Sequence, residues 1–149
     1  MHRMKINQIL ETPMFRGIGL GSNSNIIEWW STSQELAKGY ANRRENGNVL
    51  ERDINAKNPV NYSHDSKMMN PVSFVGQALK QAKRGTFDMD VAKEKATILR
   101  NHFGDGNKMV SDYWKDEKSK RIVVDFLRSL GFDSIKILED GVETYGLFK

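Results

Sequence analysis

The pattern that most constrains the fold of this chain lies at residues 132–148. The segments 132–139 and 142–148 each have the alternating apolar and polar character of a β-strand, and only Asp140 and Gly141 separate them. Asp-Gly is a favoured pair for the type I′ turn, which joins two antiparallel strands through a two-residue loop. The sequence therefore predicts a β-hairpin, so an antiparallel strand pair must be part of the fold.

The remaining segments divide into short strands and helices. Pro59 and Pro71 predict a polar loop over 55–71, and Gly131 is expected to end the last helix. This order of elements predicts an α+β fold with a mostly antiparallel sheet in a single domain, 1–149. The expected strands are 13–19, 26–30, 48–54, 132–139 and 142–148, and the expected later helices are 72–84, 90–103 and 109–130.

The first helix has a clear start signal. Residues 32–35, "TSQE", have the form of a capping box, with Thr32 as N-cap and Glu35 at the third helical position. Gly47 is expected to end this helix, and Asp88 is expected to cap the helix over 90–103. Helical spacing places an apolar set on one buried face of the first helix: Leu36, Ala37, Tyr40 and Ala41.

Composition bounds the class of protein. The 149 residues are 38% hydrophobic and 28% charged, as in a globular domain, and the net charge of +4 favours a polyanionic ligand or partner. The absence of cysteine excludes disulfides, thiol catalysis and cysteine-based zinc sites. No apolar run approaches the roughly 20 residues that cross a bilayer, and "MHRMKINQIL" is too polar for a signal peptide. We therefore expect a cytoplasmic protein without a membrane partner.

Two common kinds of binding motif are absent from the sequence. A G-x-G-x-x-G loop that starts at Gly17 would need glycine at position 22, where this chain has Ser22, and no Walker A pattern occurs. The histidines have no spacing typical of metal ligands, so no metal site is expected: His2, His64 and His102.

Arg16 and Glu143 are the two charged residues that most need an explanation. Arg16 lies between Phe15 and Gly17 in a strand expected to be buried, so its guanidinium needs an acceptor. That acceptor is either a core carboxylate or the phosphate or ribose of a ligand. Glu143 shares a strand face with Tyr145. It is either a half-exposed edge residue or a carboxylate held in a cleft to stabilise a developing cation.

Ser31 and Ser33 flank the expected cap. A helix N-terminus offers free backbone N–H groups to an anion or a polar ligand. Capping by Thr32 is compatible with a Ser31 that faces a cleft. These serines therefore have either a structural role or a ligand-binding role.

Several motifs, taken in order, resemble the ADP-ribosyltransferase-like superfamily, and most of all its small members in phage and polyvalent phage proteins. They are "FRG" (15–17), "WWSTSQELAKGYA" (29–41), "KNP" (57–59) and "LGFDSIKILEDGVETYGLF" (130–148). The resemblance leaves the helical middle of the chain unmatched. It implies a split, mostly antiparallel β-sheet of the ADP-ribosyltransferase type with a helical middle insert.

The resemblance also implies a site for NAD. Arg16 matches the first-strand arginine that holds the dinucleotide, and Ser31 or Ser33 matches the serine that orients the nicotinamide ribose. Glu143 matches the late-strand glutamate that grips the ribose and stabilises the transition state. The other positions implied to contact NAD are Gly17, Thr32 and two candidates for packing on nicotinamide, Trp30 and Tyr40.

The implied activity is that of an NAD-dependent mono-ADP-ribosyltransferase, acting in the host cytoplasm if phage-encoded. Members that modify arginine carry Glu or Gln two residues before the catalytic glutamate, where this chain has Gly141. The acceptor is therefore left open among another amino acid, a nucleic acid, a small molecule and water. The alternative is a catalytically inactive module of the same fold that binds a host protein or nucleic acid.

Overall fold

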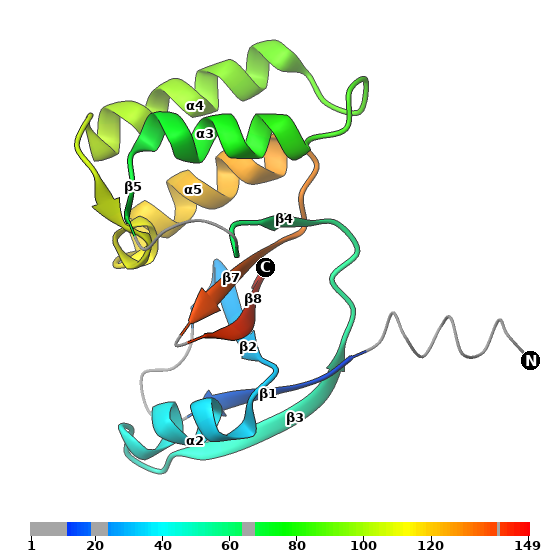
Figure 1. Cartoon of the computed structure of the whole chain (residues 1–149), viewed down its shortest axis with the longest axis vertical. Helices are drawn as coiled ribbons and strands as arrows, with labels where there is room; N and C mark the ends of the chain where they lie inside the picture. Colours follow the sequence, from blue (N-terminus) through cyan, green and yellow to red (C-terminus); the bar gives the residue numbers. More distant parts are fainter. Residues whose placement is uncertain (1–11, 19–23, 64–67, 140) are drawn as a thin grey trace, which may run out of the picture.

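A computed structural model describes residues 12–18, 24–63, 68–139 and 141–149 of the chain. These residues form an α+β structure around a six-stranded mixed sheet (Figure 1). The strand order is β3-β1-β2-β8-β7-β4, with bounds β1 Thr12–Ile18, β2 Ile27–Ser31, β3 Asn48–Ile54, β4 Pro59–Asn61, β7 Ser134–Glu139 and β8 Val142–Phe148. The helices are α2 Gln34–Asn42, α3 Pro71–Gln81, α4 Met89–Phe103 and α5 Glu117–Ser129, with a short 3₁₀ helix η1 at Val110–Trp114.

The sheet has two parts that are joined at one point. β1 pairs with β3 along its whole length, whereas its described pairing with β2 is limited to Phe15 and Ser31. β4 runs parallel to β7, and the other strand pairs of this sheet are antiparallel. Figure 1 shows α2 beside β1 and β3, with α3, α4 and α5 grouped beyond the other part of the sheet.

The predicted hairpin is confirmed. Glu139 pairs with Val142, so two residues form the loop between β7 and β8. Gly141 has a φ of 77°, in the region that glycine adopts most readily, while Asp140 lies outside the described residues. The local turn signal was sufficient because a two-residue loop fixes the pairing of the strands that follow it.

The predicted cap of the first helix was wrong by one residue. The N-cap of α2 is Ser33, whose side chain accepts a hydrogen bond from the Leu36 amide at 3.2 Å. Thr32 instead binds β8: its amide and its Oγ1 both donate to the Glu143 carbonyl, at 3.2 and 3.1 Å. Since this tertiary contact engages Thr32, the cap falls to the next hydroxyl.

The end of α2 also differs from the prediction. The helix ends at Asn42, five residues before Gly47. Gly47 is instead needed for close packing, because a Cβ there would overlap the Ala41 carbonyl. The glycine therefore lets the chain pass over the end of α2 and enter β3.

The helix predicted over 109–130 is two separate elements. Asp112 accepts from the Met109 amide at 3.0 Å and opens η1, and Asp116 accepts from the Ser119 amide at 2.7 Å and opens α5. Aspartates of this kind satisfy free N–H groups and favour a new helix start.

The predicted loop 55–71 also contains β4 and the two-residue strand β5 Met68–Met69, which pairs with β6 Lys108–Met109. Asp88 does cap α4, and Gly131 follows the end of α5, as predicted.

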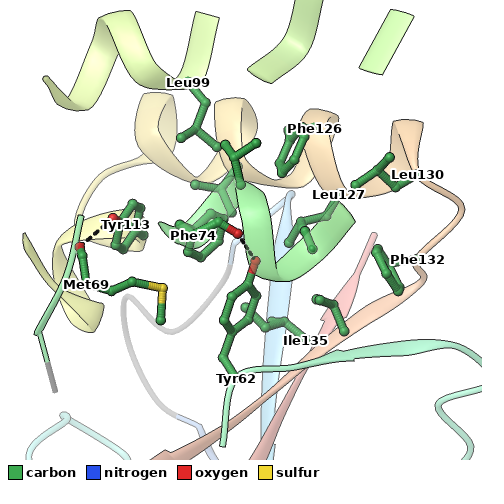
Figure 2. Packing of buried hydrophobic residues seen from close by; sticks show 14 of the residues in the cluster. Tyr62, Met69, Phe74, Leu99, Tyr113, Phe126, Leu127, Leu130, Phe132 and Ile135 are labelled. Carbon is green, nitrogen blue, oxygen red and sulfur yellow. Dashed lines mark hydrogen bonds between the residues drawn. The ribbon is translucent and has the colours of Figure 1, made fainter. Parts of the chain in front are cut away.

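The main core lies between the sheet and α3, α4 and α5 (Figure 2). Phe74 of α3 is 2% exposed and stacks on both Tyr62 and Tyr113, with ring centroids 4.5 Å apart in each pair. The Tyr113 hydroxyl donates to the Met69 carbonyl at 2.7 Å, and burial raises the pKa of Tyr113. The amphipathic helix α3 thus packs its apolar face against the core on the sheet.

Candidate functional site

The structure contains a cleft between α2 and the layer formed by η1 and α5. Its volume is about 520 Å³, within the range of 300–1,000 Å³ that is typical of small-molecule sites. The floor comes from β1, β2, β7 and β8. Among the residues that line the cleft are Arg16, Gly17, Ser24, Trp29, Ser31, Tyr40, Arg44, Ser111, Trp114, Glu117, Lys120, Glu139 and Thr144.

Strand alternation decides which side chains of β2 face the cleft. Trp29 and Ser31 lie on the face that carries the helices, and Ser31 is 6% exposed. Trp30 also lines the cleft, but its buried indole belongs to the other face, where its N–H donates to Glu28 at 2.7 Å. Of the two neighbouring tryptophans, Trp29 is therefore the one whose ring faces the cleft.

Arg16 is partly buried and lines the cleft. Strand alternation turns its side chain toward the face of Trp30 and Glu28, because Phe15 pairs with Ser31 on the cleft face. The Arg16 Nη1 donates to the Trp29 carbonyl at 3.2 Å. Burial lowers the pKa of Arg16, the Glu28 carboxylate raises it, and the Arg44 guanidinium lowers it, leaving it below its usual value. Arg16 remains charged, because even a lowered arginine pKa is far above neutrality. Both alternatives for Arg16 thus have a basis, since a core carboxylate acts on it and it also borders a ligand-sized cleft.

The charged residues of the cleft form two groups, one around Arg16 and Arg44 and one in the helical layer. Arg44, which follows α2, lies near enough to Arg16 to affect its pKa. In the helical layer, Lys120 forms an ion pair with Glu117 at 2.9 Å. Two neighbouring guanidiniums repel each other, so an anion between them is favoured. The arginine part of the cleft is therefore suited to a phosphate.

Two tryptophan rings form an aromatic surface in the cleft. Trp29 of β2 and Trp114 of η1 have ring centroids 5.0 Å apart, with their planes tilted by 55°. Val110 and Ile137 add apolar surface beside them. Such a surface is suited to an aromatic ring of a ligand. Trp114 lies in the helical middle that the resemblance leaves unmatched. Its aromatic character is the only local property that could have suggested a binding role.

The structure brings together most of the residues expected to contact the ligand, namely Arg16, Gly17, Trp30, Ser31 and Tyr40. Gly17 packs against α2, where a Cβ would overlap the Ala37 carbonyl. Thr32, Ser33 and Glu143 are not among the described residues that line the cleft. Thr32 and Ser33 have structural contacts instead, to the Glu143 carbonyl and to the α2 amides.

The Glu143 carboxylate lies on the face of the sheet opposite the cleft. It forms an ion pair with Lys136 at 3.1 Å, and 47% of its side chain is exposed. Burial lowers the pKa of Lys136, but the hydrogen bond to Glu143 and the nearby Tyr145 outweigh this effect and raise it. Thr144, the next residue, lines the cleft. The geometry thus matches the edge-glutamate alternative rather than a carboxylate in the cleft.

Sequence reasoning missed the carboxylates that do line the cleft, Glu117 and Glu139. Glu139 occurs two residues after Ile137 in β7, and both Ile135 and Ile137 are buried. Strand alternation could therefore have placed Glu139 on the same face. Glu117 lies in a stretch of mixed charges, 115–121, that is typical of a solvated helix face, and only the fold brings it to the cleft.

No group of three or more His, Cys, Asp or Glu side chains among the described residues is arranged to hold a metal ion. Within the same residues, none of the helices combines the length and the apolarity needed to cross a membrane. A scan against protein-family models, a search of the curated proteins and a search of the solved structures found no match to this chain.

Proposed function

We propose that this chain binds NAD in the cleft and acts as a mono-ADP-ribosyltransferase that cleaves the nicotinamide–ribose bond. One observation carries the proposal: Arg16, Gly17, Ser31 and Tyr40, which come from two strands and a helix, line the same ligand-sized cleft. We also propose that the sheet, with its single junction between β1 and β2, is the split sheet of the ADP-ribosyltransferase type.

The side chains in the cleft are suited to the chemical parts of a dinucleotide. Arg16 and Arg44 supply cations for the pyrophosphate, and Trp29 with Trp114 supplies aromatic surface for a base. Hydroxyl groups of Ser24, Ser31 and Ser111 lie along the same cleft and are suited to ribose. A ligand with charged, polar and aromatic parts matches this mixture better than a purely apolar ligand does.

The reaction makes limited demands on the protein. Cleavage of the nicotinamide–ribose bond builds positive charge on the ribose, as in glycoside hydrolysis, while nicotinamide leaves as a neutral molecule. The protein must therefore fix the ribose and place a carboxylate near its anomeric carbon. Ser31 and the carboxylates that line the cleft are the groups available for these tasks.

The test uses the full chain with NAD labelled in the adenine ring. We expect release of free nicotinamide, transfer of label to an acceptor in a host lysate or to water, and a rise in Tm on addition of NAD. The Arg16→Ala variant should reduce all of these signals. If NAD at millimolar concentration neither raises Tm nor is cleaved, the proposed function is wrong.

One observation favours the alternative of a catalytically inactive module. The carboxylate of Glu143, the residue that the resemblance implies to be catalytic, pairs with Lys136 away from the cleft. The two functions differ in a direct readout. A module that has kept only the fold would give no nicotinamide and would show a host protein or nucleic acid as its ligand, with or without bound NAD.

A further inference from the structure

We infer that Glu139, rather than Glu143, is the carboxylate that acts on the ligand in the cleft. This inference rests on the proposed function and names the residue that would stabilise the developing positive charge. It follows from the faces of the β7–β8 hairpin, from its register and from the contacts of the competing carboxylates.

The two faces of the hairpin are clearly different. On β7, Ile135 and Ile137 are 1% and 7% exposed and face the helices. Two residues further on, Glu139 has the same orientation by alternation, lines the cleft and is partly buried. On β8 the cleft-facing residue is Thr144, which pairs with Ile137. Glu143 therefore falls on the opposite face.

The register of β8 is held by a glycine. Gly146 faces the helices, and a Cβ there would lie 2.6 Å from Ile27 Cδ1 and 2.9 Å from the Trp29 ring. A slip of one residue would be needed to turn Glu143 toward the cleft. That slip would bring Tyr145 or Leu147 to the place of Gly146, where there is no room for a side chain. The fold thus keeps Glu143 out of the cleft.

Glu117 is the other carboxylate that lines the cleft. It forms an ion pair with Lys120 at 2.9 Å and accepts from the Ser24 hydroxyl at 3.4 Å. Glu139 comes from the strand that also supplies Ile137 to the cleft, which places it on the floor rather than at the helical wall.

With water as the acceptor, the step is balanced as follows. The bond between the ribose C1′ and the nicotinamide nitrogen breaks, and its electron pair leaves with nicotinamide. The Glu139 carboxylate stabilises the cation on the ribose ring and accepts a hydrogen bond from a ribose hydroxyl. The water oxygen then gives a lone pair to C1′ and its proton passes to solvent. The products are ADP-ribose, nicotinamide and one proton.

The experiment compares Glu139→Gln with Glu143→Gln, two isosteric changes on opposite faces of the same hairpin. Initial rates of nicotinamide release give kcat and KM, and titration of tryptophan fluorescence with NAD gives Kd. We expect Glu139→Gln to lower kcat by about 100-fold or more, as for other preorganised electrostatic groups, with Kd changed less than about threefold. Glu143→Gln should keep kcat within about threefold of the unmodified chain, because its side chain does not reach the cleft.

Each other outcome is informative. Loss of kcat in Glu143→Gln with normal kcat in Glu139→Gln overturns the inference and leaves the proposed function in place. Binding of NAD without cleavage by the unmodified chain overturns both the inference and the enzymatic proposal. If the unmodified chain does not bind NAD, both the inference and the proposed function are wrong. If Glu139→Gln lowers Tm by more than a few degrees, Glu139→Asp replaces it, and a kcat reduced by about tenfold or more with normal Tm and Kd supports the inference. Normal turnover in Glu139→Asp contradicts it.

Discussion

At the scale of single residues, Arg16 links the core to the cleft. Its guanidinium donates to the Trp29 carbonyl, and the negative charge of Glu28 raises its pKa. Arg16 and Arg44 both line the cleft. We propose that Arg16 has a ligand-binding role in addition to the structural role that these contacts give it. The two roles separate when stability and binding are measured on the same variant.

We predict that Arg16→Ala weakens NAD binding by about tenfold or more, because a charge-assisted contact to phosphate is lost. The measurement is Kd from tryptophan fluorescence, alongside Tm for both proteins. Arg84→Ala is the matched control, since Arg84 is exposed and does not line the cleft. Equal Kd values for the two variants would contradict a ligand-binding role for Arg16.

A second prediction concerns the start of α2. Ser33→Ala should lower the free energy of unfolding by about 1 kcal/mol, because the Leu36 amide loses its cap. Thr32→Val removes only the exposed hydrogen bond from Oγ1 to the Glu143 carbonyl and should cost less. Urea unfolding of both variants measures this. A larger effect of Thr32→Val would mean that Thr32 is the main support of the helix start.

The sequence predicted individual site residues unevenly, for a physical reason. Arg16 and Ser31 belong to contiguous motifs, and local sequence is enough to mark them. Whether Glu139 or Glu143 faces the cleft depends on strand parity relative to a core that other segments form. A single residue of register reverses the answer, so the motif and strand pattern around Glu143 could not decide between a cleft carboxylate and an edge residue.

At the scale of elements, the contact between α2 and β1 determines the shape of one side of the cleft. Gly17 lets the two come close, because a Cβ there would overlap the Ala37 carbonyl and lie 2.8 Å from the Ala41 amide nitrogen. These are backbone atoms that a rotamer change cannot move. The packing of α2 on β1 therefore depends on the absence of a side chain at this position.

We predict that Gly17→Ala lowers stability by about 1–3 kcal/mol, because α2 must shift away from β1. Gly39→Ala is the control within the same helix, where an added Cβ has no atom within 4 Å. It should raise stability by about 0.5 kcal/mol through helix propensity. Thermal or urea unfolding gives both values, and similar effects of the two changes would contradict the close contact.

The start of α5 leads to a prediction about pH. The Ser119 amide donates to Asp116, and this hydrogen bond is the main reason why the pKa of Asp116 is lowered. Because the folded pKa is below the unfolded value of about 3.9, this contribution to stability is present above that value and is lost as pH falls through the folded pKa. Asp116→Asn keeps a capping oxygen without the titration. The urea midpoint of this variant should fall less between pH 7 and pH 3 than that of the unmodified chain.

Elements with strong local signals were predictable, and those held by distant partners were not. The hairpin, α3 and α4 carry their own turn, cap and periodicity signals. β4 is a short strand whose pairing with β7 is parallel and 75 residues apart along the chain, from Val60 to Ile135. The division between η1 and α5 depends on whether aspartates cap or continue a helix, which helical periodicity does not resolve.

At the scale of the whole molecule, the cleft exists because the sheet has two parts with one junction. Residues of β1 and α2 line one side of the cleft, and residues of η1 and α5 line the other, with β2, β7 and β8 between them. The helical middle contributes Trp114, Glu117 and Lys120 to the same cleft. This segment therefore shapes the cleft as well as the core.

We predict that Trp114→Leu weakens binding of NAD and AMP by about tenfold, because loss of stacking on one base costs about 1–3 kcal/mol. Val72→Ala on the exposed surface of α3 is the control for a general loss of packing. Isothermal titration of both variants measures the effect. If Trp114→Leu binds AMP as tightly as the unmodified chain does, the aromatic surface is not the base site.

We expect NAD to occupy the cleft between α2 and the helical layer. A crystal structure of the chain soaked with NAD would show whether it does. We predict density for the dinucleotide in the cleft, with a phosphate oxygen about 3 Å from the Arg16 guanidinium and a base against Trp114. An empty cleft at saturating NAD, or NAD bound elsewhere on the molecule, would contradict the account.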